Sequence, residues 1–211
     1  MVSLDCIVFD LDGTLWNASS AVAVGWNRAL ATLGEARTVC QSDIEKTAGK
    51  PWEECVELTL PSLFAQEPRL TPLLESSEKE ALKELGGEFY PNLFEGLRAL
   101  AQRYKLFLIS NCLDWYLDLF FEKSGLHDLF QESNCNGKSQ LPKAEMIHKL
   151  ITKHKNLRFA YVGDTAGDEQ SSRRAGIPYF HVNYGFGESL SPDLRFDSFQ
   201  ALVDHLMHEK K

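Results

Sequence analysis

The sequence predicts an α/β protein: a doubly wound parallel sheet that carries an inserted helical domain. Four short apolar runs have the composition of buried parallel strands, and helical patterns lie between the later ones. Strands that alternate with helices imply a parallel sheet. A strand–helix–strand unit needs about 30 residues, but about 95 residues separate Asp10 from Lys105. We therefore expect a further body between the first two strands.

The four runs are the predicted core of the sheet. They read LDCIVF at 4–9, KLFLIS at 105–110, RFAYVGD at 158–164 and IPYFHV at 177–182. The first contains β-branched residues and ends abruptly at Asp10, as a buried strand does where it reaches a loop. The other three have the same character.

The long segment after the first run carries helix signals. One apolar stripe at helical spacing is followed by a glycine stop, and it consists of Val22, Trp26, Ala29, Leu30, Leu33 and Gly34. A second stripe is ended by Gly86-Gly87 and consists of Leu74, Ala81, Leu82 and Leu85. We predict a core domain formed by residues 1–16 and 89–211 and a helical cap domain formed by residues 17–88.

Composition excludes several classes of function. The chain has 30 acidic and 22 basic residues, and its net charge of −8 disfavours nucleic acid as a partner. It has no run of about 20 apolar residues, so we expect no membrane span. The first residues do not resemble a signal peptide. Five cysteines without a C-x-x-C pair suggest reduced thiols in the cytoplasm. We expect a monomer or a weak homodimer.

Polar residues gather where the predicted strands end, which is where open α/β sheets bind ligands. The candidates are Asp10, Asp12, Thr14, Ser110, Asn111, Lys143, Asp164 and Asp168. Each aspartate alone is also a common turn residue. Four that converge would repel one another unless a cation lay among them. Carboxylate oxygens suit Mg²⁺, which binds one or two carboxylates together with a substrate phosphate.

The other candidates favour a phosphate ligand. Ser110 and Asn111 offer a hydroxyl and an amide that can donate to phosphoryl oxygens, although they also fit a helix cap. Lys143 follows a proline at an expected helix start, where a cation opposes the helix dipole unless an anion lies nearby. Lys138 is the second candidate for this lysine. Thr14 follows Asp12 and Gly13 in a sharp turn.

These motifs occur in a recognisable order. DLDGTL, then Ser-Asn after a strand, then a lysine, then GDTAGD resembles the haloacid dehalogenase superfamily, and the motifs span residues 10–168. The insert resembles the small helical cap of phosphoglycolate-phosphatase-like members. The resemblance implies a Mg²⁺-dependent phosphatase that acts on a small organic phosphomonoester.

The resemblance also implies roles for individual residues. Asp10 would attack phosphorus and form an aspartyl-phosphate. Asp12 would protonate the leaving oxygen and then take a proton from water. Ser110 and Lys143 would hold the phosphoryl oxygens, with Thr14 and Asn111 as further substrate-binding residues.

The implied metal site uses the same aspartates. Mg²⁺ would bind the Asp10 side chain, the main-chain carbonyl of Asp12 and the Asp164 side chain. Asp168 would orient Lys143, orient a metal-bound water, or complete the metal shell, and the sequence leaves these roles open. In the cap, Lys50 lies in an AGKPWEE turn that resembles the loop that reaches into the site, and it either contacts an anionic group of the substrate or is a solvated lysine.

Several alternatives share the scaffold. A true dehalogenase and a phosphonate hydrolase do not need the second aspartate, so Asp12 disfavours both, although Lys46 and Lys50 keep a Schiff-base lysine possible. A sugar-phosphate mutase of the β-phosphoglucomutase type shares all four motifs. A pyrophosphatase and a non-catalytic phosphate-binding module complete the alternatives. Phosphoglycolate, sugar phosphates and nucleoside monophosphates all stay open as substrates.

Overall fold

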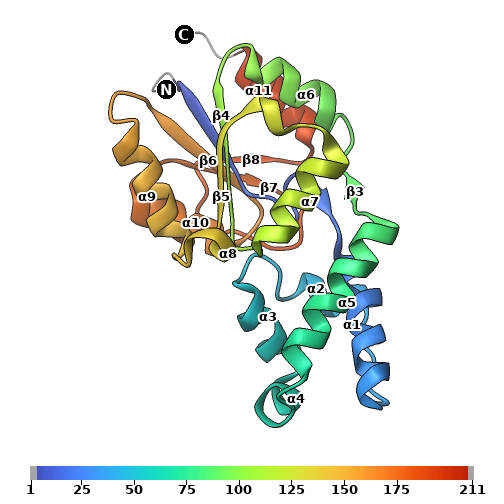
Figure 1. Ribbon diagram of the computed structural model, residues 1–211. Coiled ribbons are helices and arrows are strands. Elements are labelled where there is room, and N and C mark those ends of the chain that lie inside the picture. Colours follow the sequence, from blue (N-terminus) through green and yellow to red (C-terminus); the bar gives the residue numbers. More distant parts are fainter. Residues whose placement is uncertain (1–3, 209–211) are drawn as a thin grey trace.

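A sheet of six parallel strands forms the centre of the protein in a computed structural model, which describes residues 4–208 (Figure 1). In spatial order the strands are β5 (Phe130–Cys135), β4 (Lys105–Ser110), β1 (Cys6–Phe9), β6 (Phe159–Gly163), β7 (Tyr179–Val182) and β8 (Leu194–Phe196). The four predicted runs form the inner strands β4, β1, β6 and β7. The predicted α/β fold class is confirmed.

The side chains of the inner strands alternate between two apolar layers, as the pleat of a strand requires. Ile7 and Phe9 of β1 belong to the layer that contains α6 (Leu93–Ala101), α7 (Asp114–Ser124) and α11 (Phe199–His208). Cys6 and Val8 face the opposite layer, where α9 (Lys143–Lys153) packs beside α10 (Ala166–Ala175). Helices thus cover both faces of β1, which explains its uninterrupted apolar sequence.

Two strands of the six-stranded sheet were not predicted, and both lie at its edges. β5 has the sequence FQESNC, and only its two end residues are buried. β8 has three residues, of which Phe196 alone is buried. The short helix α8 (Asn136–Ser139) and a 3-10 turn (His127–Leu129) flank β5. No helix within residues 4–208 has the length and apolar character to cross a bilayer.

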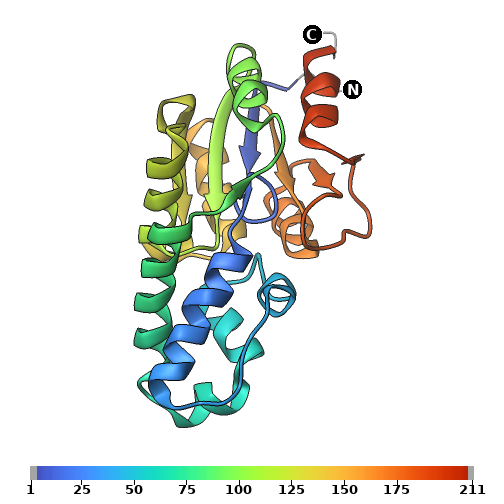
Figure 2. The ribbon, with the colours of Figure 1, turned by 90° about the vertical axis from the view of Figure 1, so that its right-hand side faces the viewer.

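The chain leaves the sheet through β2 (Trp16–Asn17) and returns through β3 (Glu88–Phe89), and these two strands pair antiparallel. Residues 18–87 between them, here called the helical insert, lie beyond the carboxyl ends of the sheet strands (Figures 1 and 2). The insert contains α1 (Ser19–Leu33), α2 (Gln41–Glu45), α3 (Trp52–Thr59), α4 (Pro61–Gln66) and α5 (Leu70–Leu85).

Helices α1 and α5 run side by side along the insert (Figure 2). Their backbones come close at Gly25, where an added Cβ would lie 2.6 Å from the Cα of Glu78. The predicted stripe that includes Trp26 is buried in this contact, and Gly34 ends α1 in a left-handed conformation with φ of 78°. The division of the chain into two domains stays a prediction, but this packing gives the insert an apolar interior of its own.

Candidate active site

The sheet register brings the motif residues together at one point. Phe9 of β1 pairs with Leu108 of β4 and with Val162 of β6. Asp10, which follows β1, therefore lies between Ser110 at the end of β4 and Asp164 just after β6. All three are buried. The structure thus places the first, second and fourth sequence motifs side by side, as their positions at strand ends predict.

Lys143 is buried among the carboxylates. Its Nζ lies 2.9 Å from Asp10 Oδ1 and 2.6 Å from Asp168 Oδ1, and 2% of its side chain is exposed. Burial lowers the pKa of Lys143, but the negative charges of Asp10 and Asp168 outweigh this and hold its pKa above the usual value. Lys138, the other lysine considered from the sequence, pairs with Asp118 on the surface. Lys143 is therefore the lysine of the site.

Asp168 has both carboxylate oxygens engaged by the protein. Oδ1 accepts a hydrogen bond from Lys143 Nζ. Oδ2 accepts hydrogen bonds from Thr165 N at 3.0 Å and from Thr165 Oγ1 at 2.7 Å. These contacts form a capping box at the start of α10, in which Thr165 is the N-cap residue and Asp168 is the third residue of the helix. The helix terminus therefore fixes Asp168, and Asp168 fixes the ammonium group of Lys143.

Asp164 is enclosed by main chain. Its Oδ2 accepts a hydrogen bond from Phe186 N at 2.7 Å, and its Oδ1 accepts one from Thr14 Oγ1 at 3.3 Å. Gly13 has φ of +76°, and an added Cβ there would lie 2.2 Å from Asp164 Oδ2, so only glycine fits this turn. Burial, and next the charge of Asp168, raise the pKa of Asp164 to about 7.

The site fits a divalent cation. Asp10, Asp164 and Asp168 each offer an oxygen, and these atoms lie within 4.8 Å of one another. Asp10 Oδ2 is sealed from solvent and has no hydrogen-bond partner among residues 4–208. Burial, and next the charge of Asp168, raise the pKa of Asp10 well above its usual range. A hard cation would satisfy the unpartnered oxygen and offset the crowded charges.

Asp12 lies apart from this cluster and faces the pocket. Tyr116 Oη, from α7, donates a short hydrogen bond to Asp12 Oδ1. Burial raises the pKa of Asp12 to about 6, and the Tyr116 hydroxyl acts in the opposite direction. Tyr116 was not predicted from the sequence, because 104 residues separate it from Asp12 and no local pattern links them.

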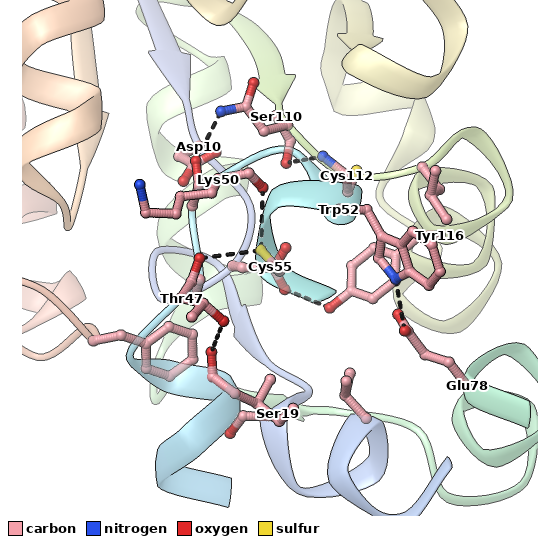
Figure 3. Close-up of a pocket in the computed structure, with 18 of the residues that line it drawn as sticks. Asp10, Ser19, Thr47, Lys50, Trp52, Cys55, Glu78, Ser110, Cys112 and Tyr116 are labelled. Atoms are coloured by element: carbon pink, nitrogen blue, oxygen red, sulfur yellow. Dashed lines mark hydrogen bonds between the residues drawn. The ribbon is translucent and has the colours of Figure 1, made fainter. Parts of the chain in front are cut away.

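The pocket lies between the sheet and the helical insert (Figure 3). The core side contributes Asp10, Asp12, Ser110 and Asn111, and the insert contributes aromatic, apolar and polar side chains. Asn111 Nδ2 donates to Gly49 O at 2.7 Å, so the loop that bears Lys50 touches the core directly.

Two of the predicted substrate-binding residues have other contacts. Lys50 lines the pocket, but its Nζ is 2.6 Å from Glu54 Oε1 and 44% of its side chain is exposed. Thr14 is fully buried behind Asp164 and does not line the pocket. Ser110 lines the pocket, and its Oγ accepts a hydrogen bond from Cys112 N at 3.2 Å.

Comparison with known proteins places this arrangement in a family. The model of the haloacid dehalogenase-like hydrolase family matches residues 7–182. The chain belongs to this family. The predicted resemblance is therefore confirmed, and with it the prediction that the chain is an enzyme of the phosphatase type.

Relatives in the haloacid dehalogenase-like family match over most of their length. A phosphoglycolate phosphatase of Psychrobacter arcticus is 28% identical over 95% of this chain and 95% of its own. One of Nitrosospira multiformis is 30% identical over 88% of this chain and 86% of its own. A crystal structure of a predicted phosphoglycolate phosphatase of Haemophilus somnus has a TM-score of 0.84 at 23% identity and covers 97% of this chain and 99% of that one.

A further solved structure shares the fold. The HAD-hydrolase YfnB of Bacillus subtilis has a TM-score of 0.75 at 16% identity, over 98% of this chain and 99% of its own. That protein is described with bound magnesium and with interdomain movement.

Proposed function

We propose that the chain is a Mg²⁺-dependent phosphatase that hydrolyses a small organic phosphomonoester through an aspartyl-phosphate at Asp10. The environment of Asp10 carries this proposal. Its carboxylate is held by the buried Lys143 on one oxygen and has an unpartnered second oxygen, at the head of a pocket that Asp12 also lines. A carboxylate so held is oriented for attack before substrate arrives.

Two proton transfers by Asp12 complete the chemistry. In the first step an oxygen of Asp10 bonds to phosphorus, the bond from phosphorus to the alcohol oxygen breaks, and Asp12 gives its proton to that oxygen. In the second step Asp12 takes a proton from water, the water oxygen bonds to phosphorus, and the aspartyl-phosphate bond breaks. Inorganic phosphate leaves and the Asp10 carboxylate is restored.

Lys143 and Ser110 hold the transferred phosphoryl group. Both are buried beside Asp10, and each offers a donor to oxygens that carry negative charge during transfer. Asp168 serves as a positioning residue for Lys143, because its second oxygen is fixed by Thr165. The sequence leaves three roles open for Asp168, and its contacts with Lys143 and Thr165 support the role of orienting Lys143.

Asp10, Asp164 and the Asp12 carbonyl would hold Mg²⁺, with Asp168 at the edge of the same cluster. When bound, the cation would neutralise charge on the phosphoryl oxygens and on the crowded aspartates. The oxygen donor set and the unpartnered Asp10 Oδ2 support this metal site. The bound magnesium of YfnB supports the choice of metal.

The helical insert acts as a cap. Its contact with the core through Gly49 and Asn111 closes the pocket over Asp10, and closure excludes bulk water while the phosphoryl group transfers. A closed pocket favours small molecules over phosphoproteins. Phosphoglycolate is a candidate substrate from the names of the relatives, beside sugar phosphates, nucleoside monophosphates and pyrophosphate.

The test is a panel of these phosphates assayed with Mg²⁺ for the wild type, Asp10→Asn and the control Asp128→Asn, whose side chain is fully exposed. We expect Asp10→Asn to keep its circular dichroism spectrum and to lose turnover by about 10³-fold or more, while the control keeps it. Chelation should abolish wild-type turnover and added Mg²⁺ should restore it. Unchanged turnover in Asp10→Asn would refute the mechanism.

A further inference from the structure

A buried carboxyl group lies at the end of the pocket away from the phosphoryl site. Glu78 of α5 is 2% exposed, yet it lines the same pocket as Asp10. Figure 3 shows Asp10 and Lys50 toward one end of the pocket and Glu78 toward the other. Part of a substrate bound with its phosphoryl group at Asp10 would therefore point toward Glu78.

The insert holds one oxygen of this carboxyl group and leaves the other to the pocket. Trp26 Nε1 of α1 and Trp52 Nε1 of α3 donate to Glu78 Oε2 at 2.7 Å and 2.8 Å. Among residues 4–208, Oε1 receives no hydrogen bond, and it is not one of the sealed atoms that lack a partner. Because three helices fix Oε2, Oε1 has a defined position at the pocket surface.

Among residues 4–208, Glu78 forms no salt bridge with a cationic side chain. Of the described residues that line the pocket, Lys50 is the only cationic one, and it pairs with Glu54. The other charged lining residues are Asp10 and Asp12. Burial raises the pKa of Glu78 to about 7, and the two indole donors only partly oppose this. A ligand that supplies a hydrogen-bond donor or a positive charge would complete the environment of Oε1.

The walls around Glu78 fit an uncharged or cationic organic group. Trp26 and Trp52 meet edge to face with ring centroids 6.5 Å apart. Other residues of the same pocket are Val22, Ile44, Cys55 and Tyr116. Aromatic walls attract ammonium groups and tolerate aliphatic carbon, whereas a second carboxylate here would be desolvated beside an existing one.

We propose that Glu78 determines leaving-group specificity: it accepts a hydrogen bond from an ammonium or hydroxyl group of the alcohol and discriminates against alcohols that carry a carboxylate. This inference rests on the proposed phosphatase function, because it concerns the alcohol part of the same substrate. It sets the chain apart in substrate preference from relatives that are named for phosphoglycolate.

Glu78 also ties three helices together, so the test needs a readout that a purely structural role would not change. The ratio of the kcat/KM values for two matched substrates is such a readout, because loss of folded enzyme lowers both kcat/KM values by the same factor. O-Phosphoethanolamine and 2-phosphoglycolate have the same two-carbon length and differ at the end group, ammonium against carboxylate. Ethyl phosphate is the uncharged reference.

The experiment measures this ratio for the wild type, Glu78→Gln and Glu80→Gln. Glutamine keeps an oxygen for the two indole donors, and Glu80 is an exposed residue of the same helix. We expect the wild type to prefer phosphoethanolamine by at least tenfold, with ethyl phosphate between the two. Glu78→Gln should reduce the preference at least tenfold, and Glu80→Gln should keep it. A wild-type preference for phosphoglycolate, or a ratio that Glu78→Gln leaves unchanged, would overturn the proposal.

A binding measurement separates this proposal from the proposed function. Calorimetric titration of the two phosphates into Asp10→Asn, with and without Glu78→Gln, reports selectivity without turnover. If Glu78→Gln reverses the binding preference while the wild type hydrolyses no phosphate of the panel, the specificity proposal holds and the phosphatase proposal fails. If turnover is present but neither ratio nor binding preference changes, the specificity proposal fails alone.

Discussion

The two ends of the pocket treat buried charge in opposite ways. At the sheet end, Lys143 pairs with Asp10 and Asp168, and the remaining acidic oxygens form a set that suits a cation. At the insert end, Glu78 accepts hydrogen bonds from two indole N–H groups and has no cationic partner within the described part of the chain. The sheet end thus suits a constant, strongly anionic group, while at the insert end the charge of Glu78 is balanced by a proton or by a ligand.

This difference suggests that the two ends of the pocket bind different parts of the substrate. Strand ends in fixed register hold the residues that any phosphomonoester needs, whereas the packing of three insert helices sets the chemistry that meets the alcohol. Changes at the sheet end should therefore affect every substrate and the stability of the fold. Changes at the insert end should act on selectivity and on pH dependence.

The largest expected effect is that of Lys143→Met. Removal of one partner from a buried ion pair leaves an uncompensated charge and costs about 3–5 kcal/mol, and here Asp10 and Asp168 would both lose their cation. We expect this loss in urea denaturation without divalent cation, together with loss of turnover on all substrates. Lys149→Met, exposed on the same helix, should change stability by less than about 0.5 kcal/mol. A Lys143→Met protein as stable as the wild type would contradict the contrast between the two ends.

The second effect is a pH-dependent stability difference between the wild type and Glu78→Gln. The pKa of Glu78 rises from 4.5 to about 7 on folding, so between these values the folded state binds more protons than the unfolded state, and stability falls as pH rises. The wild type should lose up to about 3 kcal/mol relative to Glu78→Gln from pH 4.5 to pH 7. Urea denaturation across this range measures it, and a constant difference would show that the charge at the insert end is already balanced.

A smaller effect is expected where the two ends meet. Asn111→Ala removes the hydrogen bond to Gly49 O, which holds the insert loop against the core. At about 1 kcal/mol for such a bond, KM should rise about fivefold and kcat should change little. Asn183→Ala alters an exposed contact with Asp197 and should leave KM unchanged. A fall in kcat with constant KM would instead point to a role for Asn111 in the transition state.

The smallest effect is that of Lys50→Ala. The exposed pair with Glu54 contributes less than about 0.5 kcal/mol, so thermal stability should hardly move and KM should rise about twofold to threefold. Lys46→Ala, which alters an exposed pair with Asp43, is the matched control. A tenfold rise in KM for Lys50→Ala, selective for phosphoglycolate, would assign the carboxylate of that substrate to Lys50 and weaken the contrast.

How far the sequence predicts the fold depends on where an element lies in the sheet. The inner strands are covered on both faces, so their apolar runs identify them. β5 and β8 are edge strands with exposed polar side chains, and the residues Glu132 and Arg195 interrupt their apolar pattern. Their place in the sheet depends on pairing with distant strands, which local composition does not record.

The residues of the candidate site also differ in how far the sequence predicts them. Asp10, Ser110, Asp164 and Lys143 follow from strand ends and motif order, whereas the approach of Tyr116 to Asp12 depends on how α7 packs. Glu78 was not predicted either, although its position in the sequence carries a signal. It falls at the buried spacing of α5 with Leu70, Leu74, Ala81 and Leu82. A charged residue in an apolar stripe is a reason to ask what it faces.

The pairing of Trp16–Asn17 with Glu88–Phe89 has a consequence for how the molecule can vary. Because the chain departs and returns through adjacent, hydrogen-bonded strands, the chain entropy lost on closing the sheet around the insert grows only slowly with the insert's length, by about 0.6 kcal/mol for each doubling. Helices α1–α5 can therefore be lengthened, shortened or replaced without moving Asp10 relative to Ser110 and Asp164. The residues proposed for phosphoryl transfer and those proposed to meet the alcohol therefore belong to parts of the polypeptide that can vary separately.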